Sequence, residues 1–404
     1  MIALFGLCLL VMGYALVARR MAATILTAPM LFLCFGAGMS ETGLIGAEMA
    51  ATVLHPVAEV ALVVLLFLDA AQTDLGALRH RNLWPRRMLL IGLPLVILLG
   101  TLAGVLMFPA WSLAVVALAA AILAPTDAAL GQAVVTNEDV PIRPRRALVV
   151  ESGLNDGLAL PMILLMASLA TAAQAQDGVT WVLFGAKQIV LGPLVGAVIG
   201  GLGGWALLRA KAAKSTSEPY EGAGALALAG TAYLGALMVG GNGFIAAFAA
   251  GLMFGHVVKG ACKFVYEFTE SEGQLLTWAA FFLLGAALVP EAMRHLTGPT
   301  LGFILLSLFV LRPLAIWASL MGTDARPMTR LFFGWFGPRG LATALFALLV
   351  VEMLPHALGE EILHLAVNTV WISVVLHGVT AAPGARAYAR RLGPTLPAAD
   401  PKDG

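Results

Sequence analysis

The stretch "APTDAALGQAVVTNEDVPIRPRRALVVESGLNDG", residues 124–157, places Asp127, Glu151 and Asp156 within or beside strongly apolar segments. The whole chain of 404 residues has the same character, with 60% hydrophobic and only 12% charged residues. Soluble domains carry about 25% charged residues, and the mean hydropathy of +0.91 also indicates a chain suited to lipid. The composition predicts a polytopic membrane protein, in which a carboxylate at membrane depth needs a partner or a function.

Apolar runs long enough to cross a bilayer recur along the chain, and we count thirteen of about 17–25 residues each. They cover residues 2–18, 22–38, 53–71, 88–108, 111–135, 147–171, 180–208, 221–239, 242–258, 274–290, 298–320, 330–353 and 362–382. The first run has no basic residues before it, which indicates a transmembrane helix rather than a signal peptide. The predicted fold is an all-α transmembrane unit over residues 1–382, followed by a short tail at 383–404.

The basic residues test this count, because loops that face the cytoplasm carry an excess of Lys and Arg. Twenty of the 24 Lys and Arg fall on the odd-numbered connections and the C-terminal tail. The even-numbered connections hold Arg294 alone. We therefore predict a multi-pass protein of a bacterial-type inner (plasma) membrane, with the N-terminus outside and the tail in the cytoplasm.

Other classes of function have little support in the sequence. The net charge is +1, and no basic patch interleaved with aromatic residues points to nucleic acid. The three cysteines, Cys8, Cys34 and Cys262, are odd in number and lie in or beside apolar segments, so we expect neither a disulfide nor a metal site. No phosphate-binding GxxxxGK[ST] loop occurs, and we expect no cofactor and no enzymatic activity.

Two of the predicted helices, the fifth and the twelfth, are interrupted by proline. Pro125 breaks the fifth within "APTDAALG", and Pro338 breaks the twelfth within "GWFGPRGLA". The two helices are seven apart, an odd offset, so they run in opposite directions through the membrane. Two unrelated proline kinks would give the same pattern. The pairing is also what two inverted-topology repeats predict, with crossed broken helices and a binding site where they meet.

The sixth helix carries the deepest carboxylate. Asp156 lies nine residues from its start near Ala147, about 13 Å at 1.5 Å per residue, which is close to the bilayer midplane. Ser152 and Asp156 are spaced i, i+4 and share one face of the helix, while Glu151 and Asn155 share the adjacent face. These two polar columns predict a site facing protein or water rather than lipid.

Oxygen ligands of this kind suit a hard monovalent cation, and the same carboxylate takes up a proton instead. Competition between the two for one carboxylate is the chemical basis of exchange. Thr126 and Asp127, at the break of the fifth helix, add a hydroxyl, freed carbonyl groups and a second acid.

Each acid also has a structural interpretation. Glu151 can form a structural ion pair with Arg339. Asp127 can accept hydrogen bonds from Asn155 and from backbone N–H groups near the break, and Asp156 can pair with Arg339 or Arg312. Asp69, near the end of the third helix, either lines the ion path or lies at the membrane interface beside the basic loop.

The motifs "APTDAA", "ESGLNDG" and "GPRGLATAL" (residues 124–129, 151–157 and 337–345), in this order and spacing, resemble the NhaP-type sodium/proton antiporters of the cation:proton antiporter superfamily. The resemblance covers nearly the whole chain. It implies a homodimer in which a core, about 88–171 and 298–382, moves against an interface domain, about 2–71 and 221–290, with a linker helix at about 180–208.

The resemblance also implies a role for each residue of the motifs. Asp156 would carry the cation and the proton, with Ser152 and Thr126 as further ligands of Na⁺. Asn155 stands where electrogenic relatives have Asp, which implies one cation for one proton. The resemblance further implies contact between Asp127 and Asn155, a structural ion pair of Glu151 with Arg339, and access of Asp69 to the site.

The sequence therefore predicts an electroneutral antiporter of Na⁺ (or Li⁺) and H⁺ that works by alternating access and serves pH homeostasis. A K⁺/H⁺ antiporter with the same machinery remains open, because selectivity depends on fine cavity geometry. A passive channel and an intramembrane hydrolase, with Ser152 as nucleophile and His256 or His377 as base, are more remote alternatives.

Overall fold

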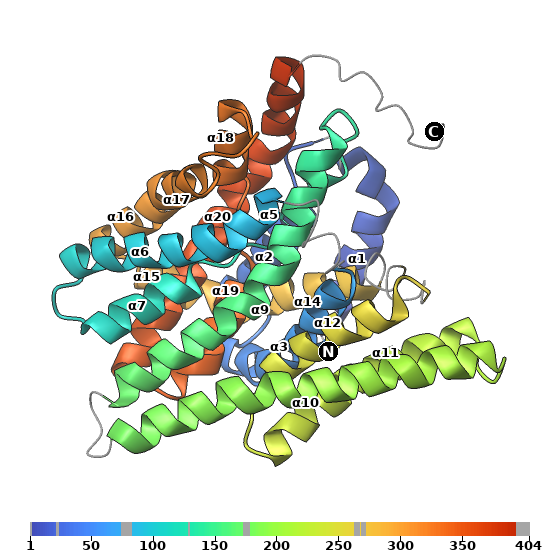
Figure 1. The fold of residues 1–404 in the computed structure, drawn as a ribbon. Coiled ribbons are helices and arrows are strands. Elements are labelled where there is room, and N and C mark those ends of the chain that lie inside the picture. Colours follow the sequence, from blue (N-terminus) through green and yellow to red (C-terminus); the bar gives the residue numbers. More distant parts are fainter. Residues whose placement is uncertain are drawn as a thin grey trace.

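The computed structural model describes residues 2–21, 24–73, 83–127, 130–172, 178–261, 267 and 272–392, and helices are the only regular secondary structure within these ranges (Figure 1). The helices of the first half are α1 (Ile2–Met21), α2 (Ala28–Glu41), α3 (Ala47–Ala71), α5 (Leu83–Arg87), η1 (Met88–Gly92), α6 (Leu93–Met107), α7 (Leu113–Ile122), α8 (Gln132–Val135), α9 (Ile142–Ala172) and α10 (Gly178–Ala212). Those of the second half are α11 (Glu218–Met238), α12 (Gly243–Val258), α14 (Glu272–Ala287), α15 (Val289–Arg294), α16 (Gly298–Leu306), η2 (Ser307–Leu311), α17 (Arg312–Ser319), α18 (Pro327–Trp335), α19 (Leu341–Val351) and α20 (His356–Leu392).

Every predicted apolar run coincides with one helix or with a consecutive set of helices, and the all-α fold is confirmed. Within the described ranges, seven continuous helical stretches are long and apolar enough to cross a membrane, and two of them combine several of the helices above. The count is below thirteen because several predicted spans are short or are divided in the structure, such as the fifth and the twelfth.

The last helix is longer than predicted. We expected it to end at residue 382, but α20 continues to Leu392 with Pro383 inside it. Tertiary packing explains the extension, because Ala385 and Tyr388 are buried and the Tyr388 ring stacks on Phe332 of α18. The rest of the predicted tail, residues 393–404, lies outside the described residues.

The two predicted breaks are present. In the fifth span, α7 ends at Ile122 and α8 begins at Gln132, and in the twelfth α18 ends at Trp335 and α19 begins at Leu341. The extended segments between them meet, since the Asp127 N–H donates to the Pro338 carbonyl at 2.9 Å. Backbone of this kind is tolerated at membrane depth only inside protein or beside a cavity.

A second pair of irregularities also follows the repeat. The fourth span contains the π-helical turn η1 and the eleventh contains η2, again seven spans apart. In each, a proline, Pro94 or Pro313, is the second residue of the helix that follows. Proline lacks an N–H and clashes with the preceding turn, which favours this local widening. The sequence analysis did not predict these turns.

Close contacts between helix backbones organise the rest of the bundle. Gly192, Gly196 and Gly200 lie one turn apart on α10, and a Cβ on any of them would meet the carbonyl oxygen of Asn242, Ala246 or Ala250 on α12. Similar approaches join α12 to α3, at Gly251, and α2 to α14, at Gly36. Helices in a membrane commonly pack through small residues, because these let the backbones approach.

The end of the bundle that holds Arg143 is called the basic end below. A cluster of side-chain contacts stabilises it. Arg143 donates to both carboxylate oxygens of Asp324, at 2.5 and 3.0 Å, and Trp84 Nε1 donates to Asp324 at 2.8 Å. The Arg143 guanidinium also lies 3.8 Å from the centroid of the Trp84 ring. These hydrogen bonds, that of Arg143 foremost, hold the pKa of the Asp324 carboxyl below its usual range.

The packing of α10 on α12 predicts that a larger side chain at the contact lowers the stability of the protein, whereas one away from it does not. Gly196→Val places side-chain carbons against the backbone of α12, so we expect a loss of about 1–3 kcal/mol of stability from overpacking. Gly224→Val is the control, since a Cβ there meets nothing within 4 Å. Thermal unfolding of the purified protein in detergent measures both variants, and equal unfolding temperatures would contradict the packing.

Candidate ion-binding site

Asp127 ties the two helix breaks together. Its backbone N–H donates to Pro338, and its side-chain Oδ2 accepts from the N–H of Leu341 at 2.9 Å. That N–H belongs to the first residue of α19 and would otherwise be one of the unpaired donors of a helix N-terminus. Gly340 makes the contact possible, because a Cβ there would overlap the Asp127 carboxylate.

Thr126, beside it, connects the break to both polar columns of α9. Its carbonyl oxygen accepts from Ser152 Oγ at 2.7 Å and from Asn155 Nδ2 at 3.3 Å. Its hydroxyl donates to Glu151 Oε2 at 3.3 Å and also contacts Asn155 Nδ2. The Asn155 amide thus reaches Thr126, and the expected contact between Asp127 and Asn155 stays a prediction.

Asp156 lies one helical turn from Ser152, as predicted. It is partly exposed in the wall of a cavity, while its Oδ1 atom is buried without a hydrogen-bond partner in the described part of the chain. An unpaired carboxylate oxygen is costly to bury, and a cation or a proton relieves that cost.

The cavity has a volume of about 300 Å³ and extends between the crossing and the basic end. Its acidic wall combines Asp69 from α3, Asp127 from the break and Asp156 from α9. Three carboxylates around one cavity repel one another, so the cavity favours a cation or protons. Asp69 thus lies on the wall it was expected to reach, and its contact with an ion stays a prediction.

Sequence reasoning missed four polar residues on this wall, namely Gln72, Thr136, Gln274 and Thr277. A signal for three of them was present: Asp69 with Gln72, and Gln274 with Thr277, are spaced i, i+3 on otherwise apolar helices, so each pair shares a face.

Glu151 has a different partner from the one expected. Its Oε1 accepts from Arg312 Nη2 at 3.1 Å, and both side chains are buried. Arg339 forms no ion pair within the described ranges, so the predicted pair of Glu151 with Arg339 is wrong. The reason is the geometry of the second break, in which Arg339 turns back and its Nη1 donates to the Gly337 carbonyl at 2.8 Å.

Arg339 is held by α20. It has no exposed surface, and its N–H donates to Ser373 Oγ at 2.7 Å. His377 lies one turn further along, with Nδ1 3.1 Å from Ser373 Oγ and Nε2 3.0 Å from the carbonyl of Trp335. Both nitrogens of His377 and the hydroxyl of Ser152 are thus engaged elsewhere, which removes the support for His377 as the base of a hydrolase.

Two crossed broken helices, joined at a polar crossing beside an acidic cavity, define a membrane transporter of the inverted-repeat class. Residues 6–387 match the family model described as "Sodium/hydrogen exchanger, transmembrane". The chain belongs to this family, which is one of transporters and not of enzymes.

Similar proteins agree with this assignment. The "K(+)/H(+) antiporter NhaP" of Alkalimonas amylolytica is 27% identical over 66% of this chain, and the "K(+)/H(+) antiporter NhaP2" of Shewanella sp. (strain ANA-3) is 26% identical over 67%. The matches span 46% of the length of these curated relatives. The structure of the "sodium proton antiporter MjNhaP1 from Methanocaldococcus jannaschii" matches 97% of this chain and 99% of its own, with a TM-score of 0.78 at 20% identity.

The ion pair between Glu151 and Arg312 predicts a large cost for its removal. Glu151→Gln leaves the buried Arg312 without its carboxylate, so we expect a loss of about 3–5 kcal/mol of stability. Glu41→Gln is the matched control, because its partner Arg294 is exposed and such pairs contribute little. Thermal unfolding in detergent measures both variants.

The double variant Glu151→Leu with Arg312→Met separates the charge from the packing. It removes both members of the pair, and we expect it to recover part of the lost stability. An unfolding temperature for Glu151→Gln equal to that of Glu41→Gln would contradict the buried pair.

Proposed function

We propose that the protein exchanges a monovalent cation for a proton across the membrane by alternating access, with Asp156 as the carrier of both. The observation that carries the proposal is the position of Asp156 on the wall of the acidic cavity, with an Oδ1 atom that is buried and has no hydrogen-bond partner among the described residues. A carboxylate neutralised by a cation or a proton crosses the low-dielectric interior at lower cost than the bare anion, which couples the two fluxes.

The ligands at the crossing are oxygens, which hard monovalent cations prefer. We propose Asp156, Ser152 and the Thr126 carbonyl as ligands of Na⁺ or Li⁺. Ser152 donates to that carbonyl in the present state, so its hydroxyl turns toward the ion when the ion binds. K⁺ is the second candidate, because the two curated relatives are named as K⁺/H⁺ antiporters.

We propose that the exchange is electroneutral. Asn155 contributes a neutral amide beside Asp156, and that amide is engaged with Thr126. Asp127 accepts the hydrogen bond from the start of α19 and so contributes to the structure of the crossing. One titrating carboxylate at the crossing gives one cation for one proton.

The moving parts are proposed to be the groups predicted from the sequence. The core contains α5 to α9 and α16 to α20, the interface domain contains α1 to α3 and α11 to α14, and α10 links them. The cavity supports this division, since Asp69 and Thr277 come from the interface group while Asp127 and Asp156 come from the core. A site between two bodies opens and closes when one moves against the other. Homodimerisation through the interface domain completes the proposal.

The basic end is proposed to face the cytoplasm across a bacterial-type inner (plasma) membrane. The N-terminus then lies outside and the C-terminus in the cytoplasm. The acidic cavity then opens inward, and the structure represents an inward-facing state. Exchange in this orientation serves pH homeostasis.

Transport in proteoliposomes tests the proposal. We expect Na⁺, Li⁺ or K⁺, added in turn, to dissipate an imposed pH gradient at a rate independent of the membrane potential. Asp156→Asn should lower the response to that of protein-free vesicles, because the amide carries no proton. Asp139→Asn, on the exposed loop before α9, is the control and should retain the wild-type rate.

Two results would contradict parts of the proposal. A flux that follows the membrane potential would contradict electroneutrality and favour a channel or an electrogenic exchanger. Wild-type flux in Asp156→Asn would contradict the site.

A further inference from the structure

A second cavity lies on the other side of the crossing, away from the basic end. It has a volume of about 210 Å³ and is lined by His55 and Glu59 of α3, Tyr233 of α11, and Glu352 at the end of α19. The Tyr233 hydroxyl donates to the Glu59 carboxylate, so the wall that α3 and α11 form is fixed by a polar contact.

The two cavities follow the same pair of helices. On α3, Glu59 lines the second cavity and Asp69 the acidic one; on α19, Glu352 lines the second cavity and Leu341 the acidic one. Two residues line both cavities, Leu62 on α3 and Leu345 on α19. They lie where the two cavities meet.

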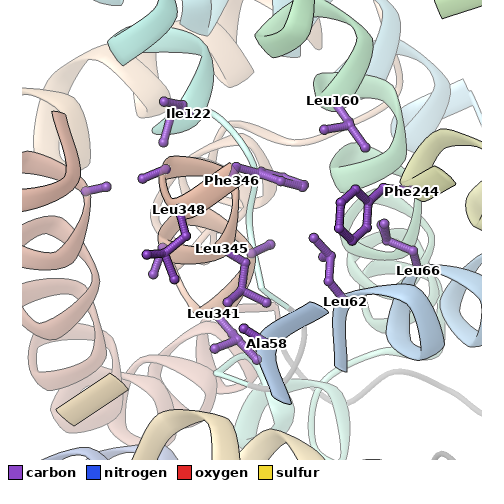
Figure 2. Packing of buried hydrophobic residues seen from close by; sticks show 14 of the residues in the cluster. Ala58, Leu62, Leu66, Ile122, Leu160, Phe244, Leu341, Leu345, Phe346 and Leu348 are labelled. Carbon is purple, nitrogen blue, oxygen red and sulfur yellow. The ribbon is translucent and has the colours of Figure 1, made fainter. Parts of the chain in front are cut away.

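We propose that Leu62 and Leu345 form the barrier that closes the ion site from the end opposite the basic end. The inference rests on the proposed function and adds the residues that separate its two access routes. Figure 2 shows both leucines among the apolar side chains of the same cluster, including Phe244 and Leu348. Leu62 is 4% exposed and Leu345 is 3% exposed, so the barrier is buried although it separates two cavities.

The chemistry of the barrier suits this role. An apolar constriction excludes water, and an ion that loses its hydration there meets no compensating ligand. The barrier is thin, since a single residue on each helix touches both cavities.

The position of the two residues also suits a gate. Leu62 belongs to the interface group and Leu345 to the core, so relative movement of the two groups separates them. Separation opens the second cavity, with Glu59 and Glu352, to Asp156, and alternating access requires that the route from Asp156 to the basic end closes in the same movement. The same leucines thus seal the site in this state and open it in the other.

Proton leak in proteoliposomes tests the barrier without any transported cation. A pH gradient is imposed in choline thiocyanate, whose permeant anion prevents a potential from forming. We expect Leu62→Ala and Leu345→Ala to raise the leak severalfold over wild type, because each removes side-chain carbons from the apolar barrier that excludes water. The double variant should leak more than either.

Three control variants separate a gate from general packing. Leu68→Ala truncates a fully buried leucine of α3, and Val350→Ala truncates a fully buried valine of α19. Neither residue lines a cavity, so both variants should leak at the wild-type rate. Leu62→Met conserves the volume and should keep the seal.

Wild-type leak in Leu62→Ala, Leu345→Ala and the double variant would overturn the proposal, and so would an equal rise in Leu68→Ala. The leak is measured without Na⁺, Li⁺ or K⁺. If none of these cations drives protons in the wild type while the two alanine variants leak, the proposed function fails and the barrier remains.

Discussion

The hydrogen bond between the Asp127 carboxylate and the first N–H of α19 holds the crossing on which the proposed ion site depends. In hydrocarbon, each unpaired backbone group costs several kcal/mol, so a helix can be broken at membrane depth only if something else satisfies its ends. Asp127 pairs backbone groups of both breaks. Its own N–H donates to the Pro338 carbonyl, and its carboxylate accepts from the N–H of Leu341. Once the two segments are joined, Thr126 lies beside α9 and brings Ser152 and Asn155 to the same place.

The buried charges around the crossing divide into a structural set and a chemical set. Glu151 and Arg312 pair directly, and Arg339 is fixed between Gly337 and Ser373. These groups stabilise the core and have no surface in the acidic cavity. Asp156 differs in where it lies. Its Oδ1 lacks a hydrogen-bond partner in the described residues, as do Asn155 Oδ1, Arg312 Nε and two nitrogens of Arg339, but of these residues only Asp156 lines the acidic cavity. A carboxylate on the cavity wall is the group that a cation or a proton can reach.

The sequence predicted those features that depend on spacing along one helix or on the order of helices. The column of Ser152 and Asp156 follows from the i, i+4 rule, and the crossing follows from the offset between Pro125 and Pro338. Features that depend on the direction of a side chain were not predictable. Glu151 has two buried arginines as candidate partners. The backbone of the second break turns Arg339 toward Gly337, and Glu151 pairs with Arg312. The end of α20 was missed because the packing of Tyr388 on Phe332 outweighs the presence of Pro383. The leucines between the cavities have no polar signal at all, so only the structure separates them from the other leucines.

We have proposed that a cation and a proton compete for Asp156. The most direct test is the release of protons when Na⁺, Li⁺ or K⁺ is added to the purified protein in weakly buffered detergent. We expect about one proton to be released for each cation bound, because a ligand must lose its proton to bind the cation, and none to be released from Asp156→Asn. Equal release from the variant, or cation binding without release from the wild type, would contradict it.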